Sequence, residues 1–214
     1  MNNIEAIIFD MDGVIVDSSW YWIEVLSNII RNYGKEISEK DKNEISGCSD
    51  EYELEILSRY IDKPVETLKK IRKEYVDSHP INYGKHAKQG IHELLHYLKS
   101  QNIRIALASS SFMVDVSRMM DELKIRDYFE VVMTGEKVQE TKPHPQIYLD
   151  TLALLNLDSS KVIVIEDSSY GIESAKRANL DVLVLQTPEF DFTNSNFKIF
   201  KSHYEIIDHL EKQK

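Results

Sequence analysis

The sequence has few of the features that mark secreted or membrane-embedded proteins. Among its 214 residues only Cys48 is a cysteine, so no disulfide can form within the chain and a reducing compartment is expected. No apolar run approaches the roughly 20 residues that a membrane-spanning helix needs. The first ten residues, MNNIEAIIFD, have neither the basic segment nor the small-residue cleavage site of a secretory signal. We therefore predict a soluble, cytoplasmic protein.

Basic side chains are also scarce. The chain has 26 lysines and arginines against 36 aspartates and glutamates, a formal net charge of -10. A nucleic acid or an anionic membrane would need a basic surface, so neither is an expected partner. A small anionic substrate remains compatible with this charge, because one site can differ in sign from the whole molecule. We expect a monomer that acts on a small molecule.

Short apolar segments alternate with helical patterns along most of the chain. The predicted strands are residues 4–9, 103–108, 131–133, 162–165 and 182–185, with a weak sixth at 198–200. The predicted helices between and after them cover about residues 91–98, 114–123, 145–155, 171–178 and 204–210. Such alternation predicts a parallel sheet with helices on both faces, and the continuous apolar strands fit burial on both sides. The predicted fold class is therefore α/β, with a Rossmann-like core.

One segment interrupts this alternation. Between Asp17 and about Pro80 we find helical patterns and no convincing strand. We therefore predict an α/β core domain made of residues 1–16 and 84–214, and an inserted all-α cap domain at residues 17–83. The linkers between them are expected near residues 14–17 and 82–88.

Polar side chains stand where the predicted strands end. Asp10 and Asp12 follow the first strand, and in an open parallel sheet the carboxyl ends of the strands are where ligands bind. Taken alone, this pair fits a polar turn as well as a site. The other groups of this kind are Ser109, Glu166 and Asp167, together with Lys142 in a loop before a helix. If the sheet is parallel, all of them converge on one edge, which favours a site.

The chemistry of these groups suggests a reaction. Four carboxylates close together would repel one another, and a hard divalent cation removes that repulsion. Oxygen ligands suit Mg²⁺. A lysine and a strand-end serine add donors for an anion. A metal, a hydroxyl, an ammonium and a carboxylate nucleophile together describe phosphoryl transfer through an aspartyl-phosphate.

Four motifs carry a family resemblance. They are DMDGV at residues 10–14, Ser109 after IRIALA, Lys142 within KPHPQIYL, and EDSSYGIESAKRAN at residues 166–179. With these motifs in this order, the chain resembles the haloacid dehalogenase superfamily, in its phosphatase and phosphomutase branch with a helical cap inserted after the first motif. The resemblance covers essentially the whole chain. Each motif alone is common, so the resemblance rests on the four motifs occurring together.

The resemblance implies catalytic roles for three residues. Asp10 would attack phosphorus and become the aspartyl-phosphate. Asp12 would protonate the leaving oxygen and then act as base toward water. Lys142 would balance the charge of Asp10. Dehalogenases of the superfamily generally lack an acid at the position of Asp12, so its presence favours phosphate esters over carbon–halogen bonds.

The resemblance also implies binding roles. Ser109, Ser110 and Lys142 would hold the phosphoryl oxygens. The implied cofactor is Mg²⁺. Its implied ligands are Asp10, the backbone carbonyl of Asp12, Asp167, and Glu166 through water.

Two positions depart from β-phosphoglucomutase-like proteins, which the chain resembles most. Trp22 stands where mutases tend to carry a histidine that protects the phospho-aspartate from water. The cap loop reads Gly47, Cys48, Ser49, Asp50, whereas mutases tend to carry an arginine after this Gly-x-Ser. An acid there would repel a second phosphate, at a cost of roughly 1 kcal/mol at 4 Å in water and several times that near a protein surface.

These departures favour a hydrolytic phosphatase acting on small phosphomonoesters. A sugar phosphomutase is the first alternative, and a non-catalytic sensor of a phosphorylated ligand is the second. A sensor would have no need of the proton-transfer carboxylate of Asp12. The aromatic pair Trp20 and Trp22 has two interpretations: both rings pack within the cap, or one faces the cleft and stacks on a substrate ring. The first is the commoner fate of such residues.

Overall fold

The computed structural model describes residues 4–45, 48–188 and 197–212. Its centre is a six-stranded parallel sheet in the order β3-β2-β1-β4-β5-β6. The strands are β1 (Ala6–Phe9), β2 (Arg104–Ser109), β3 (Val131–Thr134), β4 (Val162–Glu166), β5 (Asp181–Leu185) and β6 (Lys198–Phe200). The strand order reverses between β1 and β4, so the crevice beyond the carboxyl ends of these two strands is the expected ligand site.

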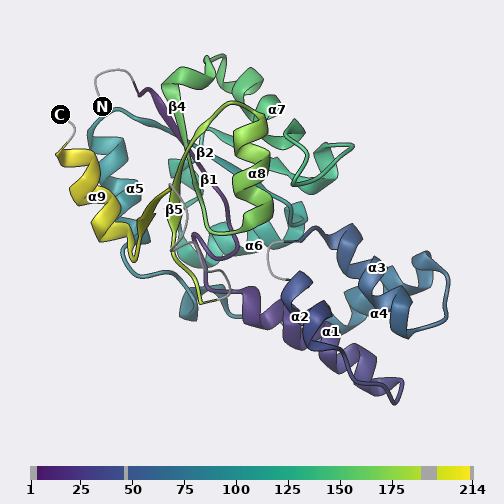
Figure 1. The fold of residues 1–214 in the computed structure, drawn as a ribbon. Coiled ribbons are helices and arrows are strands. Elements are labelled where there is room, and N and C mark those ends of the chain that lie inside the picture. Colours follow the sequence, from purple (N-terminus) through teal and green to yellow (C-terminus); the bar gives the residue numbers. More distant parts are fainter. Residues whose placement is uncertain (1–3, 46–47, 189–196, 213–214) are drawn as a thin grey trace.

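Helices cover both faces of this sheet (Figure 1). They are α5 (Ile91–Ser100), α6 (Met113–Leu123), α7 (Gln146–Leu155), α8 (Ser169–Arg177) and α9 (His203–Glu211), with short 3-10 turns η1 (Tyr83–Lys85), η2 (Arg126–Tyr128), η3 (Gly135–Lys137) and η4 (Ser159–Lys161). Alternate residues of β1 pack on opposite faces of the sheet. Ile7 and Phe9 pack with α5, α6 and α9, whereas Ala6 and Ile8 pack with α7 and α8. All four are fully buried, which explains why the strand reads as one apolar run. The predicted α/β fold is confirmed.

The inserted segment is all-α over its described residues. Its helices are α1 (Ser19–Asn32), α2 (Glu39–Ile45), α3 (Asp50–Tyr60) and α4 (Val65–Ser78). Figure 1 shows them grouped apart from the helices of the core, at the end of the sheet where β1 leads toward α1. α1 buries Leu26, Ile29 and Ile30 along one stripe, and Gly34, with a φ of 72°, follows its end. Within the described ranges no helix is both long and apolar enough to cross a membrane.

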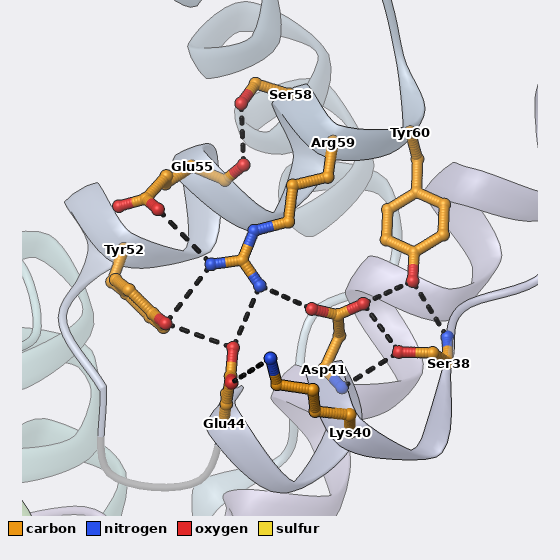
Figure 2. Close-up of polar contacts among 9 residues, drawn as sticks. All are labelled: Ser38, Lys40, Asp41, Glu44, Tyr52, Glu55, Ser58, Arg59 and Tyr60. Atoms are coloured by element: carbon orange, nitrogen blue, oxygen red, sulfur yellow. Dashed lines mark hydrogen bonds and ion pairs between the residues drawn. The ribbon is translucent and has the colours of Figure 1, made fainter.

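The sequence did not predict α2, and its side chains show why. The segment EKDKNEI has no apolar repeat: Ile45 is its one side chain in the hydrophobic core, and polar contacts join the rest of it to α3 (Figure 2). The Arg59 guanidinium on α3 donates to Asp41, and to Glu44 Oε2 at 2.8 Å. The Tyr60 hydroxyl also donates to Asp41. Hydrogen bonds from Ser38 and Tyr60 hold the pKa of Asp41 below its ordinary value, so the carboxylate stays charged for Arg59.

Two linkers join the insert to the core, and they pair with each other. Val16 and Ala87 form an antiparallel bridge. The Asp17 N–H donates to the His86 carbonyl at 2.8 Å, and the Lys88 N–H donates to the Ile15 carbonyl at 2.9 Å. The two crossings therefore form one short antiparallel ribbon.

Candidate active site

A buried ion pair lies at the carboxyl end of β1. Asp10 follows the strand and is 8% exposed, and Lys142 is 7% exposed. The Lys142 Nζ donates to Asp10 Oδ1 at 2.5 Å, to Glu166 Oε1 at 2.7 Å and to the Ala108 carbonyl at 3.0 Å. Burial raises the pKa of Asp10 to about 7, against the opposing pull of Lys142. Burial would lower the pKa of Lys142, but Asp10 and Glu166 outweigh it, so this pKa is raised and the ammonium stays charged.

Glu166 at the end of β4 is the second partner of this lysine and is fully buried. Its Oε1 also accepts the Tyr148 hydroxyl at 2.7 Å, and its Oε2 accepts the N–H of Asp167 at 3.1 Å and the Ser168 hydroxyl at 3.2 Å. A Cβ at Gly171 would lie 1.7 Å from Glu166 Oε1, so only glycine leaves room for this carboxylate. The sequence motifs alone give no role to Tyr148 or Gly171.

Three carboxylates form a group that could hold a metal ion. Asp10, Glu166 and Asp167 are all buried, and each offers an oxygen within 4.8 Å of the others. Burial raises the pKa of Asp167, and so do the charges of Glu166 and Asp10. Asp167 lies against Gly13, where a Cβ would come within 1.9 Å of Asp167 Oδ2 and where φ is +82°. Lys142 alone does not balance three acids, so an oxygen-only group of this kind suits a hard divalent cation.

Asp12 is held apart from this group by three hydrogen bonds. Its Oδ1 accepts the Ser18 hydroxyl at 2.5 Å and the indole N–H of Trp22 at 3.0 Å. Its Oδ2 accepts the Ser111 hydroxyl at 2.7 Å. The donors come from the N-cap of α1, from α1 itself and from the loop after β2, so insert and core together fix this carboxylate. Ser18 is the N-cap residue of α1, yet its hydroxyl bonds to Asp12 and makes no capping bond.

Trp20 and Trp22 have different surroundings. Trp20 is 39% exposed, and its indole N–H donates to the backbone carbonyl of Asp17. Trp22 is 7% exposed, borders the cavity above Asp10, and has the Arg72 guanidinium 4.9 Å from its ring centre. Trp22 therefore packs within the insert and also faces the cavity, with its N–H committed to Asp12. Stacking of its ring on a substrate stays a hypothesis.

Trp22→Phe is expected to lower kcat about tenfold with little change in KM, because a phenyl ring takes the place of the indole but Asp12 loses one of its three donors. Steady-state kinetics on a phosphomonoester, the substrate class that the sequence motifs imply, measure this. Trp20→Phe is the matched control, because it removes an indole N–H that bonds only to a backbone carbonyl, and its kcat should stay within about twofold. Equal losses in the two variants would show that the hydrogen bond to Asp12 does not matter.

The serines after β2 are placed differently from one another. Ser109 is 1% exposed, and its hydroxyl oxygen accepts the N–H of Ser111 at 3.1 Å, which shapes the loop. The Ser110 hydroxyl is buried without a hydrogen-bond partner among the described residues, and Ser110 borders the cavity. Both hydroxyls can therefore still donate to a phosphoryl oxygen, because Ser109 only accepts, but of the two Ser110 is the one that lines the cavity.

A narrow cavity of about 30 Å³ lies between the insert and these core residues. Its lining is Asp10, Asp12, Ser110, Ser111, Lys142 and Ser168 from the core, and Ser19, Trp22, Ile45, Cys48, Asp50 and Glu53 from the insert. Burial raises the pKa of the Cys48 thiol well above its ordinary value, so this cysteine is not a ready nucleophile. Gly47, which the sequence groups with this loop, lies outside the described residues. The cavity brings the strand-end residues and the insert together, as a substrate site requires.

Comparison with known proteins agrees with this geometry. A family model described as haloacid dehalogenase-like hydrolase matches residues 7–185. The chain belongs to this family. The matched range includes all four motifs, from Asp10 in the first to Asn179 at the end of the fourth. The predicted resemblance is confirmed.

Named relatives cover most of the chain. A phosphorylated carbohydrates phosphatase of Thermotoga maritima is 33% identical over 180 residues, which is 83% of each chain. Hexitol phosphatase B of Escherichia coli is 28% identical over 205 residues, covering 87% of this chain and 85% of the relative. The crystal structure of a β-phosphoglucomutase from Clostridium difficile matches with a TM-score of 0.84 at 26% identity, over 98% of this chain and 96% of that one. The prediction of a haloacid dehalogenase-type hydrolase is therefore confirmed.

Proposed function

We propose that the protein is a Mg²⁺-dependent phosphatase that hydrolyses a small phosphomonoester, a sugar phosphate or a similar compound, through an aspartyl-phosphate. The observation that carries this proposal is that two neighbouring aspartates have different surroundings. Asp10 is buried against Lys142 beside two further carboxylates, whereas Asp12 is held separately by three donors on the cavity wall. The names of the phosphatases from Thermotoga maritima and Escherichia coli support the substrate class.

The proposed reaction has two steps. In the first, a carboxylate oxygen of Asp10 forms a bond to phosphorus while the ester P–O bond breaks, and Asp12 gives its proton to the departing alkoxide. In the second, Asp12 takes a proton from water, the water oxygen bonds to phosphorus, and inorganic phosphate leaves as the Asp10 carboxylate is released. Lys142, Ser109 and Ser110 would hold the phosphoryl oxygens during both steps.

Mg²⁺ fits the acidic group beside this pair. Its proposed ligands are Asp10, the backbone carbonyl of Asp12, Asp167, and Glu166 through water. When bound, the ion would neutralise charge on the phosphoryl oxygens. Glu166 already accepts four kinds of donor, so its main contribution is to hold Lys142 and the start of α8 in place.

A phosphomutase is the second candidate, favoured by the structural match to β-phosphoglucomutase. Two side chains favour hydrolysis. Trp22 gives Asp12 an indole N–H and has no ring nitrogen that can exchange a proton, so it cannot replace a protective histidine. Asp50 places a carboxylate on the cavity wall, where a second phosphate would be repelled.

The paired linkers suit a moving cap. We propose that residues 17–83 form the cap domain over the core of residues 1–16 and 84–214, and that this domain opens for substrate and closes to exclude water. The donors from Ser18 and Trp22 to Asp12 would then be complete only in the closed state. The cytoplasmic location and the monomeric state stay predictions from the sequence.

A substrate panel tests the proposed function. Purified protein is assayed with sugar phosphates, nucleotides and p-nitrophenyl phosphate, with Mg²⁺ and with excess chelator. We expect phosphate release that depends on Mg²⁺ from at least one sugar phosphate. A folded protein that turns over none of these esters contradicts the proposal. Conversion of β-glucose 1-phosphate to glucose 6-phosphate in the presence of the 1,6-bisphosphate favours the mutase.

A further inference from the structure

Two carboxylates of the insert border the cavity opposite the phosphoryl-binding residues. Asp50 and Glu53 lie on the first turn of α3, are 7% and 4% exposed, and both line the cavity. The proposed reaction uses neither of them. Two buried acids in one place must have partners that stabilise them, because burial of charge is unfavourable without partners.

Arg72 on α4 holds both side chains in place. Its Nε donates to Glu53 Oε2 at 2.5 Å, and its Nη2 donates to Asp50 Oδ1. Arg72 is itself 6% exposed and lies over the Trp22 ring. The charge of Asp115 on α6 acts on the same guanidinium. One cation is thus shared among several carboxylates, and burial raises the pKa of Asp50 well above its ordinary value, so this wall presents more acid groups than its one arginine can pair.

Asp50 has an acceptor that no described residue satisfies. Its Oδ2 is buried and has no hydrogen-bond partner among the described residues, while Oδ1 is committed to Arg72. Buried polar atoms are rarely left unpaired, because an unmade hydrogen bond costs free energy. On the opposite side, Ser110 has an unpaired hydroxyl and Lys142 carries a positive charge. The cavity therefore has an anion-binding end and an acceptor end.

We propose that Asp50 Oδ2, with Glu53 beside it, accepts hydrogen bonds from hydroxyl groups on the leaving group of the substrate. This inference rests on the proposed phosphatase function and names its substrate class: monophosphates of uncharged polyhydroxy compounds such as sugars and polyols. Hydroxyl groups fit because they donate to a carboxylate without adding charge. A second phosphate or a carboxylate on the leaving group would meet these acids and an arginine already paired with them, so bisphosphates and phosphoglycolate are selected against.

Wild-type protein gives the first test, which does not depend on any variant folding. Glucose 6-phosphate and sorbitol 6-phosphate are each compared with cyclohexylmethyl phosphate, whose ring is of similar size but carries no hydroxyl groups. We expect the better of the two to exceed cyclohexylmethyl phosphate by about 100-fold in kcat/KM, because a buried acceptor left unpaired penalises the analogue. Phosphoglycolate should be at least as poor a substrate as the analogue. Equal rates for all of them, or a preference for phosphoethanolamine, overturn the inference.

Asp50→Asn gives the second test. It should lower kcat/KM for the better polyhydroxy substrate about tenfold or more, mostly through KM, and leave cyclohexylmethyl phosphate within about twofold. Glu51→Gln is the matched control, because Glu51 lies on the same helical turn with an exposed side chain and loses the same charge. A uniform loss on both esters would mean that Asp50 only supports the fold, and would overturn the inference. If the wild type hydrolyses no ester at all, the proposed phosphatase function fails instead.

Discussion

Asp10→Asn is expected to abolish turnover of every phosphomonoester, by roughly 10,000-fold or more in kcat. The amide has nearly the same shape as the carboxylate, but it is not a nucleophile toward phosphorus. The side chain is buried against Lys142, so the amide oxygen can still accept from the Nζ that lies 2.5 Å from Oδ1. The substitution also removes one of three neighbouring buried acids, which relieves repulsion with Glu166 and Asp167. Lost activity should therefore come without lost stability.

Two measurements check this expectation. Phosphate release is followed with the best ester of the substrate panel, and thermal unfolding is followed by circular dichroism. Asp17→Asn is the matched control, because Asp17 lies on the same loop with an exposed side chain, and this variant should keep full activity. If Asp10→Asn retains activity comparable to wild type, the nucleophile is another group and the proposed reaction is wrong.

The sheet could be predicted closely from the sequence, and α2 could not. The inner strands β1, β2 and β4 are buried on both faces, so their residues form apolar runs that local composition reveals. In α2 only Asp41 and Ile45 are buried. Its contacts depend on Arg59 and Tyr60, which lie more than a dozen residues further along the chain. A helix held by such distant polar partners leaves no periodic signal in its own sequence.

The same distinction applies to the site. Residues at strand ends could be predicted to converge, because parallel topology alone places Asp10 and Asp167 on one edge. The partners of Asp12 could not, because Ser111 lies 99 residues away and its serine loop fits helix capping equally well. Asp50 was predicted to repel a second phosphate. Its pairing with Arg72 across 22 residues, and its unpaired oxygen, emerged only from the packing of α3 on α4.

Asp12→Asn is expected to separate the two proton transfers of the reaction. The amide oxygen can accept from Ser18 and Trp22 as the carboxylate does, and the Ser111 hydroxyl can rotate to accept from the amide N–H. The geometry should survive, but no proton can be given or taken. A sugar phosphate, whose alkoxide needs that proton, should lose about 1,000-fold in kcat/KM. The ester p-nitrophenyl phosphate should lose only about tenfold in its first step, because nitrophenolate leaves without protonation.

The second step then provides the sharper measurement. Without a base for water, the phosphorylated Asp10 should accumulate, so rapid mixing with p-nitrophenyl phosphate should give a burst of up to one nitrophenolate per enzyme followed by a slow phase. Mass spectrometry should find the phosphoryl group on Asp10. Asp10→Asn should show no burst, and Asp17→Asn should behave as wild type. Equal losses on both esters without a burst would mean that Asp12 orders the cavity through Ser18, Trp22 and Ser111 and transfers no proton.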